Sequence, residues 1–485
     1  MRRLSSELKS SLMDYKSNLP PVRILLFSVI CIFATYVGGI SPFGLPDDLS
    51  LAAALILIAV GSFATGAMPE QLTVLIFFFA TMVLAISGPD VVFSGFNSGA
   101  FWLVFGGLII GAAVEVTGLG RRVAKFFIHH IKGSYSSVVA AVIIVNCILI
   151  FLMPSTLSRV VLLVPIIISL STEMGFKEGS KPRNGLIMAT VLTAYLCSTS
   201  VLPANVPNNV LMGASEAFLN VPIRYFDYFL LHFPVLGFLK AIIIWGCIIF
   251  VFRPKNLDFS NRESSEKTAS ESDFLRRKEE KRLLFFLACA LVLWATDAAH
   301  GIAPAWVSLA IGILCLFPKI GIVSATEFKD KVQFAPLLYV AGIIGIGAVV
   351  ADSGLGAFFS RVMIQTSGLS PANPLEGFVV LSGIAMLLSF FSTMPGVPAI
   401  MVPLASDLHE ASGLPLKTVL MTQVVGFSTV WLPYQVPPII VGMQLAGVPM
   451  RAGIKVTALI AIISIILLLP ILIIWWQILG YLPAG

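Results

Sequence analysis

One ten-residue motif occurs twice in this chain, each time inside a segment that is otherwise apolar enough to lie in a membrane. Residues 198–207 read STSVLPANVP and residues 428–437 read STVWLPYQVP, so that six of the ten positions are identical. Proline lacks an N–H group and interrupts a helix. Because non-helical backbone at membrane depth must be buried in protein or line a cavity, the paired interruption predicts a central binding site of the kind that transporters use.

The composition indicates a polytopic membrane protein. Of the residues, 57% are hydrophobic and 12% are charged, and the mean hydropathy is +0.95, whereas soluble domains contain about 25% charged residues. Basic residues cluster in loops instead of on one soluble face, which disfavours nucleic acid as a partner. The six cysteines lie in apolar runs without a CxxC spacing, so neither a disulfide framework nor a zinc site is expected. No removable signal peptide is expected, since the N-terminus is polar and no small-residue cleavage site follows the first apolar span.

A polar, charge-mixed stretch divides the apolar segments into two halves. The predicted parts are an N-terminal segment at 1–22, a first transmembrane repeat at 23–252, a linker at 253–282 and a second transmembrane repeat at 283–485. The linker is rich in Ser, Glu and Lys, a composition typical of solvated segments.

The two halves share further patterns in the same order. A glycine pattern, G-x4-GA-x-V-x3-GLG, begins at Gly106 and again at Gly342. A Ser-Thr pair follows in each half, at 155–156 and at 392–393, and the ten-residue motif comes next. This order predicts an internal repeat. The glycines permit close helix packing, either within one subunit or between subunits.

The distribution of charge predicts that the repeats are inverted. The segment from Arg121 to Lys132, after the first glycine pattern, is basic, whereas its equivalent in the second half carries only Arg361 as a basic residue. Positively charged loops face the cytoplasm. The corresponding ends of the two repeats are therefore expected on opposite sides of the membrane, with the N-terminus cytoplasmic.

The Ser-Thr pairs are predicted to be the tips of two re-entrant hairpins. The 17 residues from Ser137 to Met153 form about 25 Å of helix, which is short of a bilayer crossing. Pro154 ends this arm, a second arm follows, and residues 376–406 repeat the pattern. The predicted fold class is therefore an all-α polytopic membrane protein with about 11 transmembrane helices and two re-entrant hairpins in an inverted repeat.

Two tips and two helix breaks would then meet near the middle of the membrane. Helix N-termini there offer free N–H groups to carboxylate or sulfate oxygens, and the expected anion-binding residues are Ser155, Thr156, Arg159, Asn205, Asn208, Ser392, Thr393 and Gln435. Helix C-termini and hydroxyl groups suit Na⁺, and the expected ligands are Ser155, Ser198, Thr199, Ser392, Ser428 and Thr429. The alternative is that these hydroxyls cap helices or bond back to their own backbone.

Arg159 is a further candidate because an intramembrane arginine is costly unless it is paired or hydrated. It lies three residues after the first Ser-Thr pair, opposite the uncharged Gly396 of the other half. It could bind a carboxylate of the anion bidentately. It could instead stand in for a bound Na⁺, which would favour anion exchange, or it could pair with carbonyls at a helix end.

The order of these motifs resembles the divalent anion/sodium symporter (DASS) family over nearly the whole chain. Its Ser-Asn-Thr tips and Thr-Pro-Pro-Asn-like breaks are similar to Pro154-Ser155-Thr156, Ser392-Thr393-Met394, Asn205-Val206-Pro207-Asn208 and Gln435-Val436-Pro437-Pro438. Neither tip here keeps the asparagine. The resemblance implies a lipid-embedded homodimeric carrier of dicarboxylates, citrate or sulfate, coupled to Na⁺. The positive-inside pattern and the lack of a transit peptide predict a cell-limiting membrane, namely a bacterial inner membrane.

Other functions are less favoured by the residues. A Na⁺-independent anion exchanger is the alternative to Na⁺-coupled symport by alternating access. An anion channel would need an open or gated hydrophilic pore. An intramembrane enzyme would need a carboxylate pair, an HExxH motif or a Ser/His constellation, none of which the apolar segments contain.

Overall fold

The computed structural model describes residues 21–41, 46–129, 134–253 and 277–483, and this part of the chain is helical without any strand. Six of its helices are long and apolar enough to cross a membrane: Gly99–Thr117 (α7), Tyr135–Leu152 (α9), Thr156–Glu173 (α10), Tyr225–Phe252 (α13 to α14), Ala335–Asp352 (α20) and Met450–Ile478 (α27 to α28). Six shorter apolar helices accompany them: α2 (Pro21–Ile40), α3 (Asp47–Thr65), α4 (Glu70–Val83), α18 (Pro304–Leu316), α22 (Pro374–Phe391) and α25 (Leu416–Phe427). The predicted all-α polytopic fold is confirmed, while the number of spans and the inverted orientation stay predictions.

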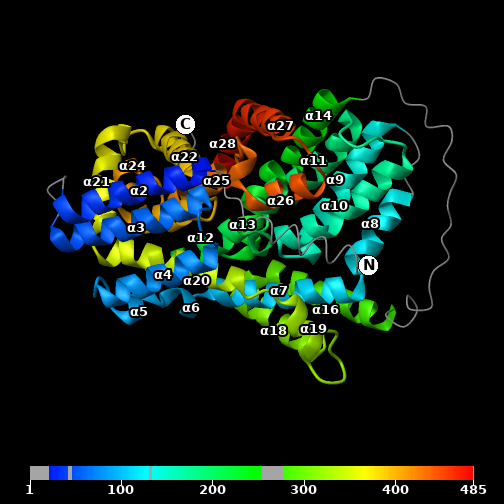
Figure 1. Ribbon diagram of the computed structural model, residues 1–485, viewed down its shortest axis with the longest axis horizontal. Helices are drawn as coiled ribbons and strands as arrows, with labels where there is room; N and C mark the ends of the chain where they lie inside the picture. The colour runs from blue at the N-terminus through cyan, green and yellow to red at the C-terminus, as the bar shows by residue number, and fades with distance from the viewer. Residues whose placement is uncertain (1–20, 42–45, 130–133, 254–276, 484–485) are drawn as a thin grey trace.

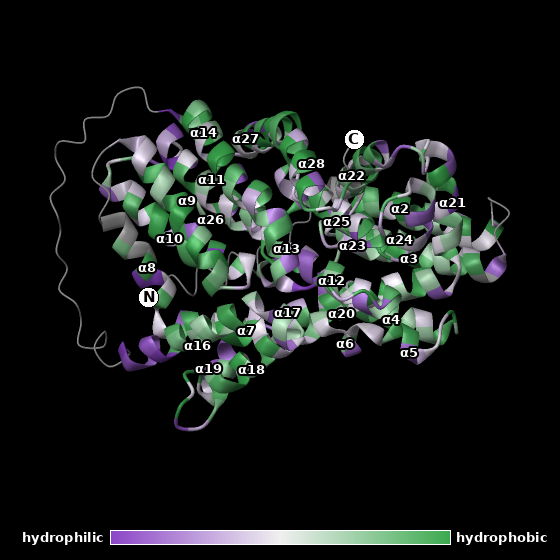
Figure 2. Ribbon diagram, turned by 180° about the vertical axis from the view of Figure 1, so that it is seen from behind, coloured by the Kyte–Doolittle hydropathy of each residue, from purple (hydrophilic) through white to green (hydrophobic). Residues whose placement is uncertain are grey.

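The helices form two layers when the molecule is seen with its long axis horizontal (Figure 1). One layer contains α4, α7, α18 and α20, together with α16 (Arg277–Ala295). The other contains α9, α10, α22 and α25, together with α11 (Lys181–Leu196). Figure 2 shows hydrophobic residues over most of both layers.

Both copies of the ten-residue motif interrupt a helix. In the first half, α11 (Lys181–Leu196) passes into short 3₁₀ turns before α12 (Val206–Leu219) begins. In the second half, α25 is followed by a 3₁₀ turn at Pro433–Gln435 and then by α26 (Pro437–Leu445). Each new helix starts with proline in its first two positions, where the missing N–H is not needed.

Each Ser-Thr pair also separates two helices. Met153 joins α9 to the tip in an extended conformation (φ −129°, ψ 100°), because the residue before a proline is pushed away from helical angles. The first pair, α9 and α10, has arms of 18 residues, or about 27 Å each. The second tip separates α22 from α23 (Gly396–Met401), which α24 (Ala405–Ser412) follows. The re-entrant path of these helices stays a prediction.

Two of the predicted segments are described only in part. Of the predicted linker at 253–282, residues 254–276 lie outside the described part of the chain, and 277–282 already belong to α16. Arg, Lys and Glu are good helix formers, so the helix extends beyond its apolar run. Of the predicted N-terminal segment, residues 1–20 lie outside the described part.

Glycines of the two repeated patterns lie at close helix crossings within the chain. A Cβ atom added at Gly106 in α7 would overlap the backbone of Ser308 in α18, and one at Gly342 in α20 would overlap Val74 in α4. At Gly111, also in α7, no atom lies within 4 Å of an added Cβ. Two of the repeated glycines therefore serve packing inside one subunit.

We predict that Gly106→Ala destabilises the protein by about 1–3 kcal/mol, since backbone atoms at the crossing must move apart. Gly111→Ala is the matched control, because it has the same change in helix propensity in the same helix but open space around the new methyl group. The measurement is thermal unfolding of the purified protein in detergent. Equal melting temperatures for the two variants would contradict the close crossing.

Candidate functional site

A cavity of about 1490 Å³ lies where the two halves meet. Both tips and both helix breaks contribute to its wall: Met153, Pro154, Ser155, Thr156, Pro203, Asn205, Val206, Pro207, Thr393, Met394, Pro395, Gln435, Val436, Pro437 and Pro438. Four motifs that lie far apart in the sequence therefore surround one space.

Three helices begin at this cavity. The first residues of α10, α12 and α26 are Thr156, Val206 and Pro437, and all three line it. Ser155 caps α10, since its hydroxyl accepts the Ser158 N–H at 3.3 Å. The first N–H groups of a helix lack intrahelical partners and carry partial positive charge. The wall is therefore suited to an anion.

The two amides at equivalent positions of the breaks differ in their contacts. Gln435 is fully engaged: its Oε1 accepts the N–H groups of Trp431 and Leu432 at 2.9 and 2.8 Å, and its Nε2 donates to the Ser389 carbonyl at 3.0 Å. Asn205 is 3% exposed, and its Nδ2 has no hydrogen-bond partner among the described residues. Of the two, Asn205 offers a free donor to a ligand.

Asn208 supports the backbone of the first break, whereas the two hydroxyl residues of the second tip do not. Asn208 donates to the carbonyls of Ser198 and Val201 at 3.2 and 2.9 Å, and it does not belong to the described cavity wall. The Thr393 hydroxyl lies 2.8 Å from the Tyr339 hydroxyl, and both residues line the cavity. Ser392 is buried away from the wall.

Four of the six expected Na⁺ ligands bond back to their own helices. Ser198 and Thr199 donate to the carbonyls three residues before them, each at 2.7 Å. Ser428 and Thr429 both donate to Val425, at 3.2 and 2.8 Å. Within the described part of the chain, Ser155 is the one expected Na⁺ ligand on the cavity wall.

Arg159 lies behind the wall and is 0% exposed. Its guanidinium donates to the Met153 carbonyl at the end of α9. It also donates to the carbonyls of Ala194 in α11 and Ala204 in the first break, at 2.8 and 3.2 Å. The side chain thus joins the first tip to the first break through their backbones. Of the roles expected for Arg159, this is the pairing with carbonyls at a helix end.

Lys240 is a buried cation that the sequence analysis did not single out. It lies within the apolar span Tyr225–Phe252, is 1% exposed, and its Nζ donates to the Ser428 carbonyl at 2.7 Å. Ser428 ends α25 at the second break. A lone lysine inside an apolar span is itself a functional signal, so the sequence did contain the clue.

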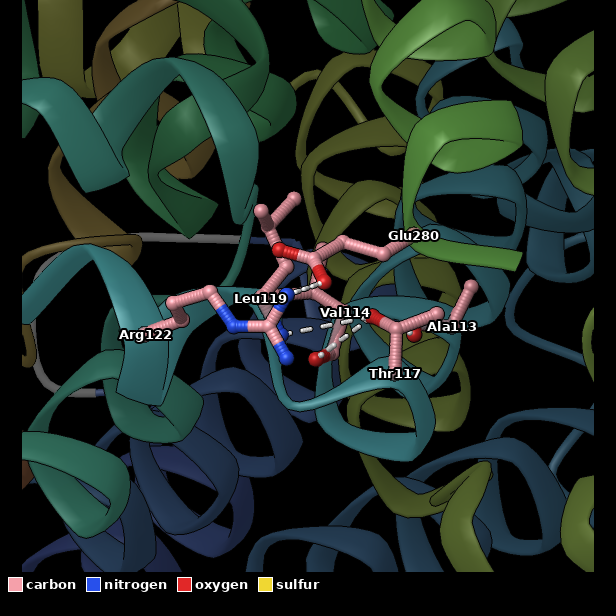
Figure 3. A network of polar contacts seen from close by, with 6 residues as sticks. All are labelled: Ala113, Val114, Thr117, Leu119, Arg122 and Glu280. Carbon is pink, nitrogen blue, oxygen red and sulfur yellow. Dashed lines mark hydrogen bonds and ion pairs between the residues drawn. The ribbon is translucent and has the colours of Figure 1, made fainter. Parts of the chain in front are cut away.

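Charged residues also line the cavity. The wall follows α10 from Thr156 to Glu173, a length of about 26 Å. Its other charged members are Glu70, Glu115, Arg121, Arg122 and Lys331. Glu115 pairs with Lys331, and Arg122 pairs with Glu280. Figure 3 shows Arg122 reaching from α8 (Leu119–His129) to Glu280 on α16.

Comparisons with known proteins relate this arrangement to membrane transporters. Residues 22–482 match the family described as "Sodium:sulfate symporter transmembrane region". The inner membrane protein YbhI of Escherichia coli K12 is 22% identical over 408 residues, which is 81% of this chain and 83% of that protein. The L-tartrate/succinate antiporter of the same strain is 24% identical over 358 residues, 71% of this chain and 72% of that protein.

A solved structure shows the same fold. The YdaH transporter of Alcanivorax borkumensis superposes with a TM-score of 0.50 at 14% sequence identity, covering 90% of this chain and 99% of that chain.

Proposed function

Since the chain belongs to the divalent anion/sodium symporter family, whose transmembrane region its residues 22–482 match, we propose that it carries a small dicarboxylate or oxyanion by exchange. The resemblance found in the sequence is confirmed. The chain is an integral membrane transporter and not an enzyme, because its family and its relatives are transporters. We also propose that the protein is a homodimer in a bacterial inner membrane. Its N-terminus would lie in the cytoplasm.

The observation that carries this proposal is the single cavity shared by both tips and both breaks. Three helix N-termini and the Asn205 amide on its wall supply donors for an anion. Ser155, Thr156 and Thr393 would add hydroxyl groups to this site, with Gln435 positioning the second break. Arg159, Asn208 and Ser392 would act from behind the wall.

Alternating access would move this site as one body. Arg159 joins the first tip to the first break, and Gln435 joins the second break to Ser389 in α22. The Tyr195 hydroxyl donates to the Phe427 carbonyl at 3.0 Å, which links α11 to α25. Such links would keep the anion-binding donors at fixed positions relative to one another. The part of the chain that carries them, α9 to α12 and α22 to α26, would then move against the layer that contains α7, α18 and α20.

Exchange is favoured over Na⁺-coupled symport by two observations. Relatives at 24% identity are named L-tartrate/succinate antiporters. The Arg159 guanidinium already binds the carbonyls of Ala194 and Ala204 at the first break, and such oxygens are the ligands that a Na⁺ ion would use. Symport coupled to Na⁺ is the second candidate, supported by the description of the family. Ser155 on the cavity wall would then be a first ligand to examine.

The first test is transport by the purified protein in liposomes. Uptake of labelled succinate, citrate or sulfate should require the same anion inside the vesicle and should be the same in Na⁺ and in choline. Empty liposomes supply the background. Uptake that follows an inward Na⁺ gradient without internal anion would replace exchange with symport.

We predict that Asn205→Ala weakens binding of the transported anion about tenfold or more, since a hydrogen bond to a charged group contributes about 1.5–3 kcal/mol. The measurement is the anion concentration that half-saturates exchange. Asn146→Ala is the matched control, because Asn146 is a buried amide of α9 that bonds to the Val142 carbonyl and does not belong to the described cavity wall. If exchange by Asn205→Ala is half-saturated at the wild-type anion concentration, Asn205 does not bind the anion.

A further inference from the structure

One carboxylate on the cavity wall has no cation partner in the described part of the chain. Glu70 lines the cavity, lies in the first turn of α4 and is partly buried. The described ion pairs involve other residues, Glu115 with Lys331 and Arg122 with Glu280. Like charges repel each other strongly where water is scarce, so a negative charge on the wall of an anion site requires an explanation.

The packing of α4 places Glu70 beside Tyr339 of α20. Two pairs of residues lie against each other along these helices: Val74 with Gly342, and Phe78 with Gly345. The two helices therefore run side by side in the same direction, and one turn before these contacts Glu70 comes level with Tyr339. The charge of Glu70 acts on the Tyr339 hydroxyl, and both residues line the cavity.

Tyr339 connects Glu70 to the second tip. Its hydroxyl lies 2.8 Å from the Thr393 hydroxyl, and its ring packs edge-on against Phe63 of α3, with 5.3 Å between the ring centroids. Thr393 is one of the residues expected to bind the anion. An ionised carboxyl group can only accept hydrogen bonds, whereas a protonated one also donates. The protonation state of Glu70 therefore decides whether this part of the wall repels an anion or offers it a donor.

The helices packed around Glu70 supply no cation to balance its charge. α4 packs against α3, α20 and α5 (Pro89–Val92), and none of these four helices contains Lys, Arg or His. Their other carboxylates with described side chains lie at the helix ends away from Glu70: Asp47, Asp90 and Asp352. Arg121 and Glu173 also line the cavity, and neither forms an ion pair with Glu70 among the described contacts. The N-terminus of α4 offsets part of the charge, and a proton would remove the rest.

We propose that Glu70 is a proton-binding site and that the cavity binds a dianion when this carboxyl group is protonated. This inference rests on the proposed anion site in the cavity. The protonated carboxyl group removes the repulsion and adds a donor beside the hydroxyls of Tyr339 and Thr393. The proton comes from the solvent on the side where the anion enters and returns to the solvent where the anion leaves. Each dianion is then carried together with one proton.

The first test is the pH dependence of exchange by the purified protein in liposomes, with the same pH on both sides of the membrane. We expect the succinate concentration that half-saturates exchange to rise about tenfold per pH unit above about pH 7, because the fraction of carriers able to bind the dianion falls in that proportion. Succinate itself stays doubly charged in this range, since carboxyl groups titrate at lower pH. In Glu70→Gln the half-saturating concentration should stay at the low-pH value of the wild type across the range.

Glu376→Gln is the matched control. Glu376 is an exposed carboxylate in the first turn of another apolar helix, α22, and it does not belong to the described cavity wall. This variant should keep the wild-type dependence on pH. Glu70→Ala also removes the carboxyl group and should likewise lose the dependence on pH, so it gives the same test if the glutamine variant does not fold.

A second readout measures the proton directly and does not need transport. Succinate is added at about pH 8 to the purified protein in a weakly buffered detergent solution that contains a pH indicator. Because anion binding and protonation are linked, the wild type should take up about one proton for each anion bound. Glu70→Gln should take up none, and Glu376→Gln should behave as the wild type does.

The outcomes separate this proposal from the proposed exchange. If the wild type takes up a proton with succinate but shows no anion exchange, the exchange is wrong and the proton site stands. If the half-saturating concentration of the wild type does not change with pH, or if folded Glu70→Gln keeps the wild-type dependence, the proton-site proposal is overturned. Loss of anion binding by folded Glu70→Gln at every pH would also overturn it, because glutamine should bind as the protonated carboxyl group does.

Discussion

Interrupting a helix inside a membrane leaves backbone carbonyls without partners, and no lipid can supply them. This protein has two such interruptions and two helix tips around one cavity, and side chains satisfy the exposed backbone. Arg159 takes carbonyls of the first tip and the first break. Lys240 takes the carbonyl that ends α25. Without these donors the backbone behind the cavity wall would contain unpaired carbonyls, each of which costs free energy when buried.

The backbone of the site could be predicted from the sequence because prolines and paired polar residues act locally. Pro154 forces Met153 out of the helix whatever surrounds it. Pro203 lies between α11 and α12, and Pro207 occupies the first turn of α12, where its missing N–H is not needed. The convergence of four motifs on one cavity also followed from the repeat, since equivalent elements in two halves tend to meet at the repeat interface.

The roles of individual side chains could not be predicted in this way, because they depend on tertiary neighbours. Asn205 and Gln435 are equivalent in sequence, yet the longer Gln435 reaches Ser389 while the Asn205 amide keeps a free donor. Hydroxyls that looked available for Na⁺ bond back to their own helices. The lone Lys240 in its apolar span is a signal in the sequence, but its partner Ser428 lies 188 residues away in the chain, so its contact could not be predicted.

The two halves repeat the backbone but not the charge. Arg159 has the uncharged Gly396 as its equivalent at the second tip. Lys240 follows a π-helical turn at Phe233–Leu239, and the matching turn at Ser464–Leu468 is followed by Leu469. Both buried cations therefore come from the first half. The cavity is lined by backbone that the two halves repeat, whereas the cations behind it belong to one half alone. A repeated backbone therefore fixes the shape of the site, while its charge is set by side chains that differ between the halves.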